Sequence, residues 1–238
     1  YIDDHTQNAE SLTEAFAATT ETDTVEDTTI ETGDDDQKQN HIGSSENVEM
    51  LKQATDPIDE KLTLRLQEIL SDDFILVSRL KEKSLPVYEH CLQIAEISEK
   101  AAKTIQANAL LAKAGGFYHE IGKMNEIHNY IEEGIKLSKE YDIPEKVQDI
   151  IRQHNIKNEK PTSMEAIIVM FSDNILSSLE YIQKSNDMKT KKLTPDKIIN
   201  QIFQMRMEKG TLDEVGITLN SYKKLLDFYT ETFQNYND

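Results

Sequence analysis

The chain has 238 residues, of which 37% are hydrophobic and 29% charged, and it carries a formal net charge of −18 with no Trp. We expect a soluble globular protein, because no apolar run approaches the roughly 18 to 20 residues that a membrane-spanning helix needs. The strong acidity disfavours nucleic acid as a partner. The single cysteine, Cys91, excludes an intrachain disulfide and fits a reducing compartment.

The acidic charge is concentrated at the N-terminus, where residues 1–50 hold 14 Asp and Glu against one Lys. This segment is rich in Thr, has few large apolar residues and shows no sustained period. It therefore cannot bury enough surface to offset its ordering entropy. We predict a disordered acidic tail or linker over residues 1–57 and one helical domain over 58–238. The tail is either a regulatory segment or a solubilising linker, and its composition favours the linker.

The chain opens on Tyr1 rather than Met and has no signal-peptide pattern. This predicts a soluble piece of a longer protein whose missing part lies upstream. The expected location is the cytoplasm, either as a separate protein or as the cytosolic portion of a membrane protein.

From about Pro57 onward, apolar residues recur at helical spacing, so the expected fold class is all-α. Capping residues and Pro positions mark the helix starts. Helices are predicted over residues 56–71, 72–83, 84–107, 108–120, 130–142, 144–155, 163–184, 195–209 and 218–234.

Two of these predicted helices carry further expectations. In 84–107 the inward-facing candidates are Leu92, Ala95, Ile97, Ala101, Ala102 and Ile105. The helix 108–120 is apolar or small nearly all round, so it belongs in the centre of the domain. Its Gly115-Gly116 pair indicates a neighbouring backbone that passes close, and Gly122 is expected to break the helix.

Several polar residues that can ligate metals lie near predicted helix ends or inside an apolar face. His90 is near a helix start, His119-Glu120 and His154 are at C-terminal ends, and Asp173 interrupts a buried helix. A buried Asp needs compensation from hydrogen bonds, a cation or a metal ion. Imidazole and carboxylate ligands suit Fe, Mn or Zn, whereas the absence of a cysteine cluster argues against a structural zinc site.

Each residue also has a plainer interpretation. A lone His at a helix C-terminus, such as His154, is more often a favourable partner for the helix dipole. Asp173 alone more often caps a helix or hydrogen-bonds a neighbour. Adjacent His90 and Cys91 point apart on a helix, which argues against a Cys–His nucleophile.

The order of these residues is more informative than any one of them. His90, then HEIGK over residues 119–123, then His154 and Asp173 resembles the motif order of the HD-domain metal phosphohydrolases. Residues 85–123, LPVYEHCLQIAEISEKAAKTIQANALLAKAGGFYHEIGK, are similar to the cytosolic HD domain of the seven-transmembrane HD proteins, whose studied members hydrolyse cyclic di-AMP. The resemblance runs from about Leu64 to Phe233 and implies an HD-type helical bundle.

The resemblance implies a role for each motif residue. Lys123 corresponds to a phosphate-facing lysine, and His154 to a histidine that binds metal and positions or protonates the substrate. The implied metal ligands are His90, His119, Glu120, His154 and Asp173. Lys157 and Lys160 are expected to join Lys123 in making the entrance of the site positively charged.

Three positions depart from the family pattern. Glu120 replaces an Asp, and its extra methylene moves the carboxylate outward by about an ångström. Tyr130 and Asn155 replace two histidines that serve mainly the second metal in binuclear members. The pattern therefore favours one divalent ion over two, with Mn or Fe preferred.

The resemblance supports two functions. The first is a metal-dependent phosphodiesterase that acts on a cyclic dinucleotide through metal-activated water, with Lys123 stabilising the developing charge. The alternative is a catalytically weak or inactive HD module that binds a nucleotide or a protein partner for regulation. A plain helical interaction domain without metal is a third, less favoured, hypothesis.

Overall fold

The computed structural model describes residues 57–186 and 192–236. Within these ranges the chain forms nine α-helices and one short 3₁₀-helix and has no strand, which confirms the predicted all-α class. The predicted acidic tail lies outside the described residues except for Pro57, which is the first residue of the first described helix.

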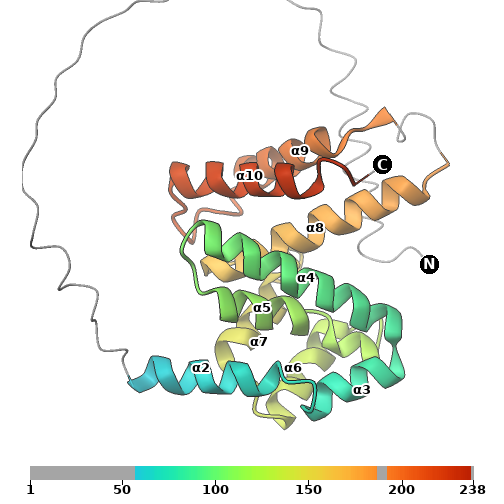
Figure 1. Cartoon of the computed structure of the whole chain (residues 1–238), viewed down its shortest axis with the longest axis vertical. Helices are drawn as coiled ribbons and strands as arrows, with labels where there is room; N and C mark the ends of the chain where they lie inside the picture. The colour runs from blue at the N-terminus through green and yellow to red at the C-terminus, as the bar shows by residue number, and fades with distance from the viewer. Residues whose placement is uncertain (1–56, 187–191, 237–238) are drawn as a thin grey trace, which may run out of the picture.

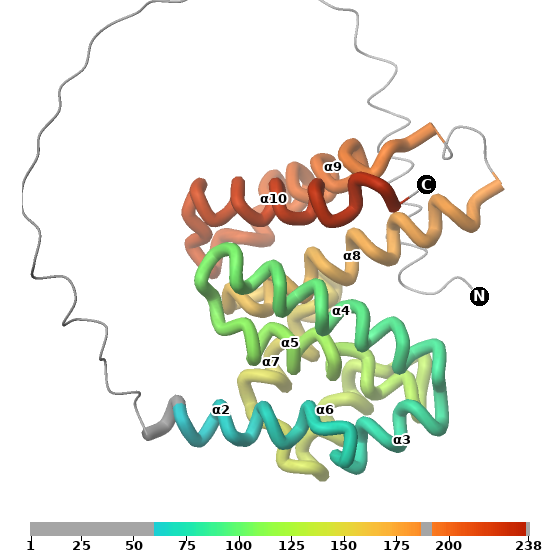
Figure 2. Tube along the Cα trace, in the orientation of Figure 1, coloured from blue at the N-terminus to red at the C-terminus, as the bar shows by residue number. Residues whose placement is uncertain are grey.

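The helices follow the predicted ranges closely, and Figure 1 and Figure 2 show how they are arranged. The helices are α2 (Pro57–Ile69), α3 (Ile75–Lys83), α4 (Leu85–Thr104), α5 (Ala109–Tyr118), η1 (Ile121–Met124), α6 (Tyr130–Glu140), α7 (Glu145–Gln153), α8 (Met164–Lys184), α9 (Pro195–Glu208) and α10 (Leu219–Phe233). α3 begins three residues later than predicted, because the Phe74 N–H donates to the Ser71 carbonyl and closes a turn over Asp72 and Asp73.

Helix α5 is central, as its apolar surface predicts, and packs against α4, α7 and α8. The expected close approach of a backbone at its glycine pair is confirmed for Gly116. A Cβ at this position would lie 2.9 Å from both the Ala95 Cα and the Ile94 carbonyl oxygen of α4. This close approach fixes the two helices that precede the 119–123 motif relative to each other.

The predicted inward face of α4 is right for most of its residues and wrong for Leu92, which is 37% exposed. The buried face is rotated by one residue at this end of the helix, because Cys91 and Ile94 face the core instead. The buried residues of α4 are Cys91, Ile94, Ala95, Ser98, Ala101 and Ala102.

Helices α9 and α10 cover one side of α8 (Figure 1). Phe171 of α8 stacks on Phe203 of α9, with ring centroids 4.0 Å apart. The buried Tyr229 hydroxyl of α10 donates to the Ile168 carbonyl at 3.0 Å and lies 2.9 Å from the Ser172 hydroxyl. These contacts fix the rotation of α8 about its axis and therefore the direction in which Asp173 points.

Gly122 does not end α5 directly but lies inside the 3₁₀-helix that follows it. A Cβ here would collide with the Tyr130 carbonyl oxygen and lie 2.5 Å from the Gly134 nitrogen of α6. The glycine is required because the backbones of η1 and α6 touch.

We expect Gly122→Ala to lower the free energy of unfolding by about 2 to 4 kcal/mol, because neither backbone can move without disturbing the core. Chemical denaturation measures this change. Gly134→Ala is the matched control: its Cβ would lie 3.3 Å from Ile151 Cγ2 and 3.5 Å from the Gly122 nitrogen and Ile121 Cγ2, which are close to ordinary contacts. Ala also favours the helix, so we expect a change under about 1 kcal/mol. Equal losses in the two variants would contradict the steric argument.

Candidate metal centre

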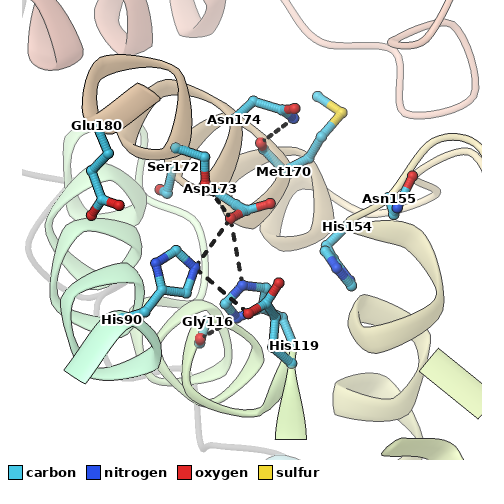
Figure 3. Close-up of polar contacts among 12 residues, drawn as sticks. His90, Gly116, His119, His154, Asn155, Met170, Ser172, Asp173, Asn174 and Glu180 are labelled. Carbon is cyan, nitrogen blue, oxygen red and sulfur yellow. Dashed lines mark hydrogen bonds and ion pairs between the residues drawn. The ribbon is translucent and has the colours of Figure 1, made fainter. Parts of the chain in front are cut away.

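Four of the five predicted metal ligands meet in one buried cluster. One ligand atom from each of His90, His119, Glu120 and Asp173 lies within 4.8 Å of the others. They come from α4, the end of α5, the start of η1 and the middle of α8, and Figure 3 shows the histidine rings turned toward Asp173. Residues distant in the sequence therefore converge on one point.

The end of α5 positions His119. Its ring Nδ1 lies 2.7 Å from the Gly116 carbonyl oxygen, one of the carbonyls left without a helical partner at a C-terminus. The Nδ1–H donates to this oxygen, so in the neutral ring Nε2 carries the lone pair and points into the cluster. Helix termination thus selects the tautomer that a metal ligand needs.

The atoms facing His119 Nε2 test whether the cluster suits a cation. Asp173 Oδ1 lies 3.6 Å from this nitrogen and 3.3 Å from His90 Nε2. Among the described groups none hydrogen-bonds to His119 Nε2, which is completely buried. A lone pair and a carboxylate oxygen that face each other in a dry place repel unless a proton or a metal ion lies between them. The donor set, two imidazoles and two carboxylates, fits a divalent ion.

Glu120 connects the cluster to Lys123. One carboxylate oxygen, Oε1, lies 2.5 Å from Lys123 Nζ, and the other, Oε2, lies 3.9 Å from His90 Nε2. The longer side chain of Glu, compared with Asp, lets one carboxylate face both groups. Lys123 is 8% exposed and also lies over the Tyr130 ring, 4.9 Å from its centroid, so its charge is held at the cluster.

The charge behind Asp173 comes from Arg206 of α9. This guanidinium is buried and donates to Asn174 Oδ1 at 3.1 Å. Burial lowers the pKa of Arg206 to about 10, and the negative charge of Asp173 opposes that decrease. Lys123 and Arg206 supply positive charge nearby. The ligand atoms of the two carboxylates and the two imidazoles nevertheless still point at one another.

His154 is placed beside the cluster but is outside the group of four. It caps α7, and its Nδ1–H donates to the Ile151 carbonyl at 2.9 Å, the same arrangement as in His119. Its Nε2 accepts a hydrogen bond from the Tyr130 hydroxyl at 3.1 Å. The Asn155 amide in turn donates to that hydroxyl at 3.4 Å. Tyr130 therefore hydrogen-bonds to His154 directly, and Asn155 is connected to it only through the Tyr130 hydroxyl. The ring centroids of His154 and His119 lie 5.0 Å apart.

Cys91 is buried beside this site and does not take part in it. Burial, and then the charge of Glu120, raises the pKa of the thiol well above its ordinary value. A buried thiol that resists ionisation is a poor nucleophile. This agrees with the prediction against a Cys–His nucleophile.

A cavity of about 430 Å³ opens over the cluster and is lined by His90, Glu120 and Lys123. Sequence reasoning missed most of its other lining residues, which include Pro86, Val87, Ile127, Ser177, Tyr181 and Lys184. Those on α8 lie on one face with Asp173, at positions +4, +8 and +11, and this spacing is a signal that the sequence contains.

The two other lysines expected at the mouth are placed elsewhere. Lys157 lines a separate polar cavity of about 210 Å³ with Asn155 and Asn158. Lys160 Nζ donates to the Gly210 carbonyl in the turn between α9 and α10. Lys184, which the sequence interpretation did not consider, lies at the cavity over the cluster instead.

Comparison with known proteins agrees with the fold. Residues 87–177, from the start of α4 to Ser177 of α8, match the HD domain family model. Two solved structures of the HD domain of the phosphodiesterase PgpH from Listeria monocytogenes, one of them in complex with cyclic-di-AMP, have the same fold. Each has a TM-score of 0.58, with 23% and 22% identity over 69% and 68% of this chain and 99% and 96% of theirs. The chain is therefore similar to HD domains over residues 87–177, and the predicted HD-type helical fold is confirmed.

Curated relatives extend the similarity beyond the matched region. An uncharacterized protein of Synechocystis, slr0104, is 22% identical over 73% of this chain, and the cyclic-di-AMP phosphodiesterase PgpH of Bacillus subtilis is 22% identical over 66%. The chain spans 28% of the length of each of these relatives. Within the described residues, no helix combines the length and apolarity needed to cross a membrane.

Proposed function

We propose that this domain is a metal-dependent phosphodiesterase that hydrolyses a cyclic dinucleotide. The convergence of His90, His119, Glu120 and Asp173 carries the proposal, because this donor set fits a catalytic divalent ion. When bound, such an ion supplies Lewis-acid chemistry: it lowers the pKa of a water molecule and polarises a phosphoryl oxygen. We infer one ion per chain, Mn or Fe, since Tyr130 and Asn155 stand where further histidines are expected.

The chain's own groups have distinct roles in this proposal. Asp173 and Glu120 would hold the charge of the ion, and the two Nε2 atoms would complete its protein ligands. Lys123 lies at the same cavity and would stabilise negative charge on the phosphoryl oxygens while it orients Glu120. His154 was predicted as a ligand and as a group that positions or protonates the substrate. Its Nδ1–H donates to Ile151 and its Nε2 accepts from Tyr130, so the neutral ring has no proton at Nε2 to donate, and we propose that it positions the substrate together with the Tyr130 hydroxyl.

Cyclic di-AMP is the proposed substrate, because the PgpH proteins among the relatives are named as phosphodiesterases for it and a PgpH HD domain has been solved with it. We also propose that the domain acts in the cytosol as part of a longer membrane protein, as the resemblance to the seven-transmembrane HD proteins implies.

The test is hydrolysis of cyclic di-AMP by purified protein with Mn²⁺, followed by chromatography of the products. We expect turnover that chelation abolishes and that His119→Ala lowers by about 100-fold or more, because the ring supplies a ligand. Linear dinucleotide and short single-stranded RNA are the comparison substrates. If neither dinucleotide is hydrolysed above the His119→Ala background, the enzyme proposal is wrong.

The hydrogen bonds between Tyr130, His154 and Asn155 favour a second candidate function. In this network a Tyr and an Asn, which bind metal more poorly than imidazole, stand where the family has histidines. A regulatory module that binds nucleotide without turnover would need only the remaining site. Tight binding of cyclic di-AMP by the metal-loaded protein, with no product formed, is the result that selects this function.

A further inference from the structure

We propose that Tyr118 is a positioning residue for the metal centre, and that helix α2 controls how tightly the centre binds its ion by holding this tyrosine. This role rests on the ion-binding part of the proposed function and does not require hydrolysis. Tyr118 is the last residue of α5 and directly precedes the ligand His119. A displacement of its side chain therefore acts on the backbone turn that carries the ligand.

The hydroxyl of Tyr118 is bound to the end of α2. It donates to the Ile69 carbonyl oxygen at 2.5 Å, and both residues are completely buried. Ile69 is the last residue of α2, so its carbonyl has no partner within the helix, and the phenol supplies one. Burial raises the pKa of Tyr118, which keeps the hydroxyl protonated and able to donate. The bond therefore joins the ends of two helices.

The last turn of α5 is held from two sides. On one side the His119 ring is tied to this turn by its hydrogen bond to the Gly116 carbonyl, so Nε2 moves whenever the turn moves (Figure 3). On the other side the bond from Tyr118 to α2 resists such a movement. Metal–ligand distances are held to within about 0.2 Å, and groups that orient ligands typically contribute about 10- to 100-fold to metal affinity. The position of α2 is therefore coupled to the affinity for the ion.

Helix α2 has a second attachment that does not involve α5. Arg65 Nη2 donates to the Tyr141 carbonyl at 2.7 Å, and Arg65 Nε donates to the Asp142 carbonyl at 3.2 Å, at the C-terminal end of α6. In Figure 1, α2 lies at the end of the domain away from α9 and α10, and Pro57 at its start connects it to residues 1–56. A pull on the chain upstream of Pro57 would reach α2 before any other described helix.

The first measurement is the affinity for Mn²⁺ by calorimetry. Tyr118→Phe removes only the hydroxyl, and we expect Mn²⁺ to bind about tenfold more weakly. Arg65→Met loosens α2 without touching α5 and should weaken binding by about threefold or more. Tyr141→Phe is the matched control: it removes the hydroxyl that accepts from Arg79 but keeps the carbonyl that Arg65 uses, so its affinity should stay within about twofold of the wild type. Circular dichroism checks the fold of each variant.

The second measurement is hydrogen exchange of the α2 amides, residues 58–69. Coupling between two sites is reciprocal, so an ion that binds better when α2 is docked must also favour the docked helix. Mn²⁺ should therefore slow exchange in α2 by about tenfold in the wild type and by less than about twofold in Tyr118→Phe. A tyrosine with a merely structural role would change the exchange equally with and without Mn²⁺.

Two results overturn the proposal. One is a folded Tyr118→Phe variant that binds Mn²⁺ as tightly as the wild type, and the other is wild-type exchange in α2 that does not respond to Mn²⁺. If Tyr118→Phe does not fold, Arg65→Met and the wild-type exchange decide. A wild type that binds no Mn²⁺ refutes the metal centre together with this role, whereas both effects without any turnover refute only the enzyme proposal.

Discussion

Asp173→Asn is expected to lower the metal content from about one ion per chain to below about a tenth of that, with the fold retained. The substitution keeps the shape of the side chain but removes the charge that faces both histidine Nε2 atoms, at 3.3 and 3.6 Å. An amide is a weak ligand for Mn or Fe, and the Nε2 lone pairs alone do not hold the ion. Elemental analysis of protein purified without chelator measures the effect.

Glu180→Gln is the matched control for this variant. Glu180 lies on the same helix and lines the same cavity, but it is outside the group of four. We expect its metal content to equal that of the wild type. Loss of metal in both variants would show that the general negative charge of the cavity, and not the cluster, binds the ion. Full metal content in Asp173→Asn would exclude the cluster as the site.

The double substitution Tyr130→His with Asn155→His is expected to raise the metal content from about one ion per chain to about two. In the structure the Tyr130 hydroxyl hydrogen-bonds to both His154 and Asn155. Two imidazoles at these positions would converge with His154 in place of that hydroxyl, beside the ring of His119.

Tyr130→Phe separates the two effects of the substitution. It removes the hydrogen bond to His154 Nε2 but adds no ligand, and it keeps an aromatic ring beneath Lys123. The content should therefore remain near one ion. A double variant that also stays at one ion, with normal folding by circular dichroism, would mean that the two positions do not determine the number of ions.

The helices could be predicted well because their start signals are local. Asn108 accepts from the Leu111 N–H and Ser163 from the Ala166 N–H, so both cap the helices at which they were expected. The error at Leu92 has a different origin. The register of a buried face depends on which neighbour the helix packs against, and for α4 the partners include α8 and α10, which follow much later in the chain.

Only the part of the candidate site that follows from the order of the motif residues could be predicted. The four clustered ligands were found because their residue types and order resemble a known family. The hydrogen bond between Tyr130 and His154, in contrast, is a tertiary contact between the first residue of α6 and the end of α7. No local sequence pattern predicts it. The cavity wall was missed for a similar reason, since an exposed Ile127 in a connecting segment looks unremarkable until α8 and α4 are placed around it.

The bonds from His119 to the Gly116 carbonyl and from His154 to the Ile151 carbonyl hold each ring from the side opposite to its Nε2 atom. Each imidazole is therefore oriented by its own helix, whatever its Nε2 contacts. An imidazole held in this way would keep its place whether its Nε2 met a metal ion or a tyrosine hydroxyl, because the hydroxyl satisfies the same lone pair. We therefore expect the architecture to tolerate a change in the number of bound ions through substitutions at one or two positions.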